Sequence, residues 1–177
     1  MSDLISKLTG DQAVEVLERL VAGGTGMARR VEAEAKLVLA ALDSDEVADD
    51  VFAELDRIAA EDCWDMAGSR RDGYMSAEDA AAYLIEEAVQ PFAERAARCH
   101  ELGMPDQDRD CCAGIVLGLY RFTKESKSAF KDWCTDIPEN SAFCLLQDWR
   151  KRNPDATARE SMSAFIRATC PQWANCL

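Results

Sequence analysis

The stretch that decides the fold is SAEDAAAYLIEEAVQPFAERAARCHEL, residues 76–102. Its apolar residues recur at intervals of three and four, which is the spacing of one face of an α-helix. They are Ala81, Leu84, Ile85, Ala88, Phe92, Ala96 and Cys99. Ser76 is suited to cap the start of this helix, and Gly103 is suited to end it. Pro91 lies inside the stretch, and because its ring clashes with the carbonyl of Glu87 we predict a kink or a break there.

Helical spacing continues on both sides of this stretch, beginning with a capping box at Thr9 and Gln12. We predict seven or eight helices, over about 10–22, 27–42, 44–66, 77–102, 106–122, 126–133, 136–153 and 155–170. The fold class is therefore all-α, and short links predict that consecutive helices pack as antiparallel pairs. Both a degenerate α-α superhelix and a compact bundle stay open, with the superhelix favoured by the short links and broad apolar faces.

The length of 177 residues suits one domain or two small ones. We predict a single domain over 1–177, with any subdivision near 68–75, where residues 70–74 are typical of a turn. Gly114 and Gly118 share a helix face four residues apart. Because glycine lacks a side chain, they predict that another helix approaches closely at this point.

The net charge of −13 is unevenly distributed along the chain. Residues 1–110 hold 26 acids and 11 bases, whereas residues 111–177 hold seven acids and nine bases. An acidic surface repels phosphate backbones, so we do not expect the protein to bind nucleic acid. No apolar run approaches the roughly 20 residues that a bilayer requires, and no export signal is visible, so we expect a cytoplasmic protein.

Eight cysteines are present, and in a reducing cytosol we expect most of them to be buried thiols. Four residues flank Gly103 and have a second interpretation. They are Cys99, His100, Cys111 and Cys112. Thiolates and one imidazole suit zinc, provided that a helical hairpin brings these residues together. A thiol-based metal-binding or redox-responsive protein is therefore the alternative to the function that we favour. No Cys-x-x-Cys pair supports it.

Other catalytic and metal-binding patterns are incomplete. Asp106, Asp108 and Asp110 resemble the start of a calcium loop, but Cys111 and Leu117 stand where that loop needs Gly and Glu. An acidic helix N-terminus explains the three aspartates better. No glycine-rich phosphate loop and no oriented nucleophile are visible, so we predict neither catalysis nor a cofactor.

Two clusters are candidates for binding a protein partner. The first contains Trp64, Asp65, Arg70, Arg71 and Tyr74, and its Trp, Arg and Tyr are residue types enriched in interface hot spots. The alternative is that both aromatic rings pack inward while the arginines pair with nearby acids. The second cluster is basic and could meet an acidic partner or the acidic half of a second copy. It contains Arg121, Lys124, Lys127, Lys131, Arg150, Lys151 and Arg152.

The stretch from Gly73-Tyr74-Met75-Ser76 to Gly118-Leu119-Tyr120-Arg121-Phe122 resembles prokaryotic helical-repeat proteins of the tetratricopeptide or HEAT type. It is also similar to the helical region that follows some SWIM-type zinc fingers. The Trp and Pro positions of the tetratricopeptide pattern do not recur here. The resemblance implies a partner-binding scaffold with no catalytic residues to transfer. We therefore expect a non-catalytic protein–protein interaction or scaffold module, with a protein partner or as a homo-oligomer.

Overall fold

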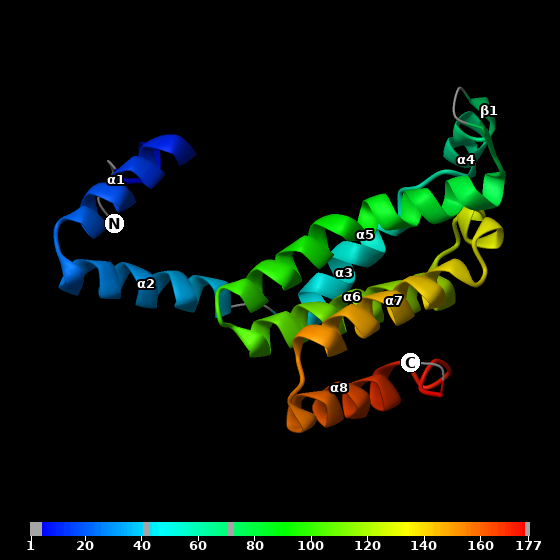
Figure 1. Cartoon of the computed structure of the whole chain (residues 1–177). Helices are drawn as coiled ribbons and strands as arrows, with labels where there is room; N and C mark the ends of the chain where they lie inside the picture. Colours follow the sequence, from blue (N-terminus) through cyan, green and yellow to red (C-terminus); the bar gives the residue numbers. More distant parts are fainter. Residues whose placement is uncertain (1–4, 41–42, 71–72, 176–177) are drawn as a thin grey trace. The chain divides into compact units, whose positions relative to one another are not determined.

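A computed structural model of the chain describes residues 5–40, 43–70 and 73–175. These residues form eight α-helices, two short 3-10 helices and one two-stranded hairpin, which confirms the all-α prediction (Figure 1). None of the described helices is long and apolar enough to cross a membrane. The chain divides into two compact units, Met1–Ala41 and Leu42–Leu177. The predicted point of subdivision, residues 68–75, lies within the second unit.

The first unit contains η1 (Ile5–Lys7), α1 (Gly10–Ala22) and α2 (Thr25–Ala40). The predicted capping box is present: Thr9 Oγ1 accepts a hydrogen bond from the Gln12 amide, and Gln12 Oε1 accepts one from the Thr9 amide. Gly24, with φ 137°, makes the turn between the two helices because other residues rarely adopt this conformation. The unit is a helical hairpin.

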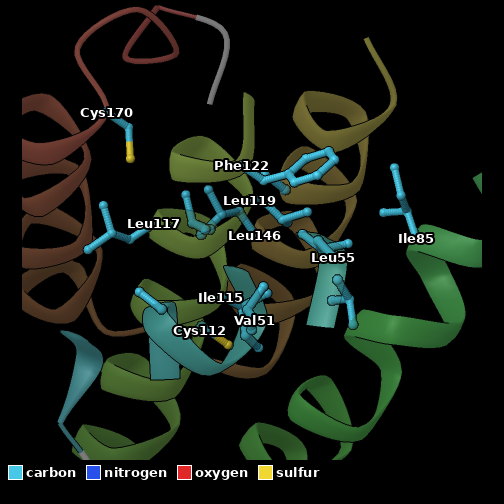
Figure 2. Packing of buried hydrophobic residues seen from close by; sticks show 14 of the residues in the cluster. Val51, Leu55, Ile85, Cys112, Ile115, Leu117, Leu119, Phe122, Leu146 and Cys170 are labelled. Atoms are coloured by element: carbon cyan, nitrogen blue, oxygen red, sulfur yellow. The ribbon is translucent and has the colours of Figure 1, made fainter. Parts of the chain in front are cut away.

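The second unit contains the remaining six α-helices, arranged around α6. Its elements are α3 (Ser44–Asp56), α4 (Ala60–Met66), β1 (Gly68–Arg70), β2 (Gly73–Met75), α5 (Ala77–Glu101), α6 (Pro105–Glu125), η2 (Ala129–Trp133), α7 (Ile137–Arg152) and α8 (Ala156–Thr169). Helix α6 contacts α3, α5, α7 and α8. Every residue of α6 between Cys111 and Leu119 is buried, as expected for a helix surrounded by others (Figure 2).

Helices α3 and α6 approach each other closely at two glycines, as the sequence predicted. A Cβ atom added at Gly114 would lie 2.6 Å from the carbonyl oxygen of Ser44. One added at Gly118 would lie 2.7 Å from Cβ of Val51. No side chain fits at either position without moving α3, so these glycines set the distance between the two helices.

The predicted helix over 44–66 is wrong because it is two helices, α3 and α4. Asp43, not Ser44, caps α3, since its carboxylate accepts a hydrogen bond from the Asp45 amide at 2.9 Å. The second helix starts where the Asp62 carboxylate accepts a hydrogen bond from the Ala59 amide at 2.8 Å. This side-chain contact to the backbone allows a new helix to begin after the link.

Two further differences concern the region from β1 to α5. The predicted turn at 70–74 joins two short antiparallel strands, in which Ser69 lies opposite Tyr74. Pro91 does not break α5, which runs continuously from Ala77 to Glu101. Buried residues on both sides of Pro91, such as Ile85 and Ala96, hold α5 against the core along its length.

Candidate interaction surface and buried polar network

Two tryptophans from separate elements lie together on the surface of the second unit. Trp64 on α4 is 53% exposed and Trp133 at the end of η2 is 43% exposed. Their ring centroids are 6.0 Å apart with an interplanar angle of 85°, an edge-to-face arrangement. Such contacts between aromatic rings are favourable beyond the area that they bury. We call Trp64 and Trp133 the tryptophan pair.

The neighbours of each tryptophan in the sequence explain why the rings face outward. Cys63, which precedes Trp64, is fully buried. Successive side chains of an α-helix point about 100° apart, so anchoring Cys63 in the core turns Trp64 toward solvent. Phe130 and Cys134 are likewise buried and hold the segment that carries Trp133. The tryptophan pair is therefore presented by buried anchors.

The structure places the other residues of the predicted cluster differently. Tyr74 on β2 is 75% exposed, so neither it nor Trp64 packs inward as the alternative interpretation required. Arg70 lies in β1 opposite Gly73, while Arg71 is outside the described residues. The sequence did not indicate Trp133, because nothing local shows that it lies beside Trp64.

Exposed acidic residues lie next to the tryptophan pair in the sequence. Asp62 and Asp65 lie on α4 on either side of Trp64, and Asp132 precedes Trp133; all three are exposed. A groove of about 560 Å³ lies between the C-terminal part of α3, the start of α4 and the middle of α5. Its charged lining consists of three carboxylates and one guanidinium: Glu54, which pairs with Arg57, together with Asp62 and Glu87. Its apolar lining is Ile58 and, on α5, Leu84, Ala88, Pro91 and Phe92.

The predicted basic cluster is largely occupied by contacts within the chain. Arg121 bridges Asp45 and Asp49 of α3, each at 2.6 Å. Lys124 lies over the ring of Tyr120, and Lys131 donates a hydrogen bond to the Ser126 carbonyl. Lys151 pairs with Asp148, and Arg152 pairs with Asp108. These contacts within the chain weaken the hypothesis that the cluster meets an acidic partner.

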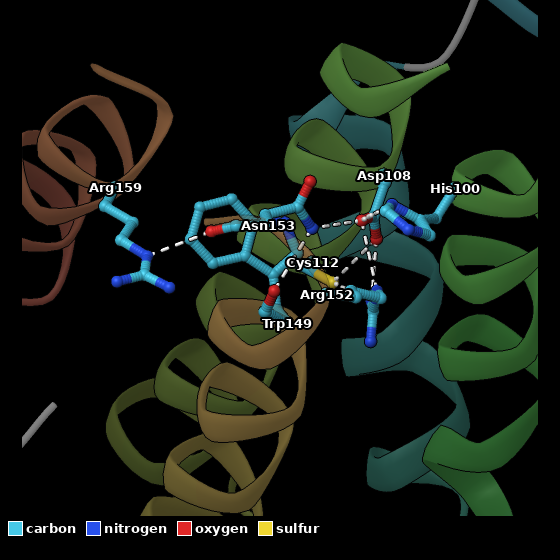
Figure 3. Close-up of polar contacts among 7 residues, drawn as sticks. All are labelled: His100, Asp108, Cys112, Trp149, Arg152, Asn153 and Arg159. Carbon is cyan, nitrogen blue, oxygen red and sulfur yellow. Dashed lines mark hydrogen bonds and ion pairs between the residues drawn. The ribbon is translucent and has the colours of Figure 1, made fainter. Parts of the chain in front are cut away.

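A polar network centred on Asp108 lies inside the second unit (Figure 3). Asp108, in the first turn of α6, is fully buried. Arg152 donates two hydrogen bonds to its carboxylate, at 2.7 and 3.1 Å, and Asn153 Nδ2 donates a third at 2.7 Å. A carboxylate can be buried when a paired cation and further donors replace its hydration.

The network extends to four helices. His100 Nδ1, near the end of α5, lies 3.6 Å from Asp108 Oδ2, beyond hydrogen-bonding distance. Asn153, which ends α7, also donates to the carbonyl of Trp149 and accepts a hydrogen bond from Arg159 of α8. The network therefore brings together the C-terminal ends of α5 and α7 and the N-terminal ends of α6 and α8.

The aspartates around Asp108 have separate roles. Asp106 and Asp110 are partnered by Arg109, at 3.0 and 2.9 Å, near the surface. Only Asp108 faces the core, so the three carboxylates do not converge as a calcium loop would require. The predicted acidic helix N-terminus is present in α6.

The alternative metal site is not assembled. Over residues 5–40, 43–70 and 73–175, no group of three or more His, Cys, Asp and Glu side chains is placed to hold a metal ion. Cys111 Sγ donates to the Phe92 carbonyl, whereas Cys112 Sγ donates to Asp108 on a different side of α6. Burial raises the pKa of Cys111 to about 12 and raises those of Cys99 and Cys112. These thiols are therefore protonated at neutral pH and are weak nucleophiles.

Most cysteines behave as the sequence predicted. Among the seven described, all are free thiols and all but Cys144 are buried. Cys99, Cys111 and Cys112 contribute to packing around α5 and α6.

No protein-family model, curated protein or solved structure matches this chain. The resemblance to helical-repeat proteins therefore stays a prediction.

Proposed function

We propose that this protein is a non-catalytic protein–protein interaction module whose partner docks on the tryptophan pair. The observation that carries the proposal is the edge-to-face contact of Trp64 and Trp133, both about half exposed, on two elements far apart in the sequence. Two large rings held together at the surface by buried neighbours offer a preformed apolar contact.

The energetics of interfaces support this choice of surface. Tryptophan and tyrosine are enriched among the few residues that supply most of the binding free energy in protein complexes. The rings of the tryptophan pair already contact each other, so a partner need not order them from a disordered state. Tyr74, at 75% exposure, adds a third aromatic side chain on the hairpin that follows α4.

The surrounding charges support a partner of basic and apolar character. Three exposed acids adjoin the tryptophan pair in the sequence: Asp62, Asp65 and Asp132. The groove that Asp62 also lines has an excess of carboxylates, since Arg57 pairs with Glu54 and Glu87 is a further acid, and it has an apolar wall on α5. Complementary charge speeds association and suppresses wrong partners, so a segment with lysine or arginine around apolar residues suits this surface.

The proposal is tested by affinity capture with the full chain, comparing the wild type with Trp64→Ala and Trp133→Ala. We expect the same basic protein to be lost from both variants, and the purified partner to bind each at least about tenfold more weakly. Because both rings are exposed, the melting temperature should change little.

The matched control is Tyr83→Ala, which removes a 49% exposed aromatic ring from α5, outside the tryptophan pair. This variant should capture the partner as the wild type does. If no captured protein depends on Trp64 and Trp133, or if Tyr83→Ala loses the same proteins, the tryptophan pair is not the docking surface.

A further inference from the structure

The hairpin of α1 and α2 has an apolar face that the hairpin itself does not cover. No described side chain of either helix is buried. Val14, Leu17 and Val21 lie on one face of α1 and are 54%, 46% and 43% exposed. Helices of 13 and 16 residues are marginal alone in water and are normally stabilised by packing such a face.

The two helices of the hairpin diverge from the turn between them (Figure 1). A groove of about 640 Å³ lies within the hairpin. Its apolar lining is Leu17 of α1 together with Met27, Val31, Ala35 and Val38 of α2, and Arg30 and Glu34 complete it. The α2 residues recur every three or four positions, so they form a continuous stripe. A stripe of this kind is suited to receive another helix.

Helix α1 has a second apolar row beside the first. Val16 and Leu20 are four residues apart and are 43% and 39% exposed. A helix with two adjacent apolar rows can pack against two neighbours, as each helix of a four-helix bundle does. Within the hairpin, the described residues of α1 pack against one other α-helix, α2. The second apolar row of α1 is therefore free to contact another helix, as it would in a bundle of four helices.

The distribution of charge favours a second copy of this chain as the source of the other two helices. Residues 1–41 hold six acids and five bases, a net of −1, whereas residues 42–177 hold 27 acids and 15 bases, a net of −12. Electrostatic repulsion between two copies is therefore weaker when they meet through their hairpins than when they meet through residues 42–177. Within the hairpin, α1 carries three acids and one base, while α2 carries three bases and two acids. A two-fold axis that places α1 of one copy against α2 of the other joins helices of opposite net charge.

We propose that the α1–α2 hairpin is a homodimerisation element, in which two hairpins form a four-helix bundle through Leu17, Val31 and Val38. The interaction is separate from the tryptophan pair, since it uses another unit of the chain. The protein would then present two copies of its partner-binding surface.

The test is sedimentation of the full chain over a wide range of concentrations. We expect the wild type to form a dimer that dissociates on dilution, and Val38→Lys to raise the dissociation constant by about tenfold or more, because the dimer would bury an unpaired charge. Val38 is 76% exposed in the single chain, so the variant should retain its helical content. Leu17→Lys tests the α1 side of the groove in the same way.

The matched control is Leu37→Lys, which adds the same charge at the adjacent position. Leu37 is 66% exposed and does not line the groove. The dimer dissociation constant of the Leu37→Lys variant should therefore stay within about twofold of the wild-type value. Trp64→Ala should also dimerise normally, which separates this proposal from the partner-binding one. A wild type that is monomeric at every concentration, because another protein or the rest of the chain covers the groove, overturns the proposal. A dimer whose dissociation constant is the same in the wild type, Val38→Lys and Leu17→Lys also overturns the proposal.

Discussion

At the scale of single residues, the carboxylate of Asp108 depends on a small number of partners. It is fully buried, and Arg152 supplies the cation that pairs with it. Asn153 contributes one neutral donor, and the Cys112 thiol lies 3.6 Å away. Removing one partner of a buried pair leaves an uncompensated charge, which costs far more than breaking an exposed pair.

We therefore predict that Arg152→Met lowers the free energy of unfolding by about 3 kcal/mol. The control is Lys151→Met, which makes the same substitution at the next residue but breaks only an exposed pair with Asp148, so it should cost less than about 1 kcal/mol. Urea unfolding of both variants checks the difference. Equal losses would show that the Asp108 network does not stabilise the end of α7.

Sequence reasoning could not single out Asp108, for a physical reason. Asp106, Asp108 and Asp110 are the same residue type in one turn, and a helix N-terminus favours all three. What distinguishes Asp108 is Arg152, which lies 44 residues away in the sequence. For the same reason the sequence groups Arg152 with a basic surface cluster, because a charge in a sequence does not show whether its partner is solvent or a buried acid.

At the scale of secondary-structure elements, the packing of α3 on α6 depends on two positions without side chains. Gly118 faces Ala48 and Val51 of α3, and Gly114 faces Ser44 and Val47. Alanine favours helix formation over glycine by up to about 1 kcal/mol, so a substitution here sets helix propensity against steric overlap. The overlap involves backbone oxygen atoms, which cannot turn aside as a flexible side chain can.

Gly118→Ala should therefore lower the free energy of unfolding by about 1–3 kcal/mol, because a Cβ 2.7 Å from that of Val51 forces the two helices apart. Gly26→Ala, in a helix where nothing lies within 4 Å of the added atom, should be neutral or slightly stabilising. Thermal unfolding monitored by circular dichroism measures both. A stabilised Gly118→Ala would mean that α3 moves away at little cost.

The elements themselves were predictable where apolar residues recur at helical spacing, and less so at their ends. The periodicity that identifies α5 and α6 does not reveal the short link at residues 57–59, because the helices on either side of it have compatible apolar stripes. The strands β1 and β2 have three residues each, too few for alternation to be recognised.

At the scale of the whole molecule, the two units show what periodicity leaves undetermined. Val14, Leu17 and Val21 have the same kind of spacing as Val47, Val51 and Leu55. The first set is about half exposed, while the second is buried in the core. An apolar stripe establishes that a face must be covered, but only tertiary contacts establish what covers it. A single domain over 1–177 could therefore be expected from the sequence, whereas none of the hairpin side chains that the structure describes belongs to the buried cluster.

This division predicts the behaviour of a shortened chain. Residues 43–177 should fold alone and melt cooperatively within a few degrees of the full chain, because the buried cluster runs from Val47 to Trp173 and Asp43 still caps α3. The same fragment should sediment as a monomer at concentrations where the full chain dimerises. Circular dichroism and sedimentation of the two proteins make the comparison. A fragment that unfolds or precipitates would show that the α1–α2 hairpin covers part of the core, and the hairpin would then belong to one domain with the rest.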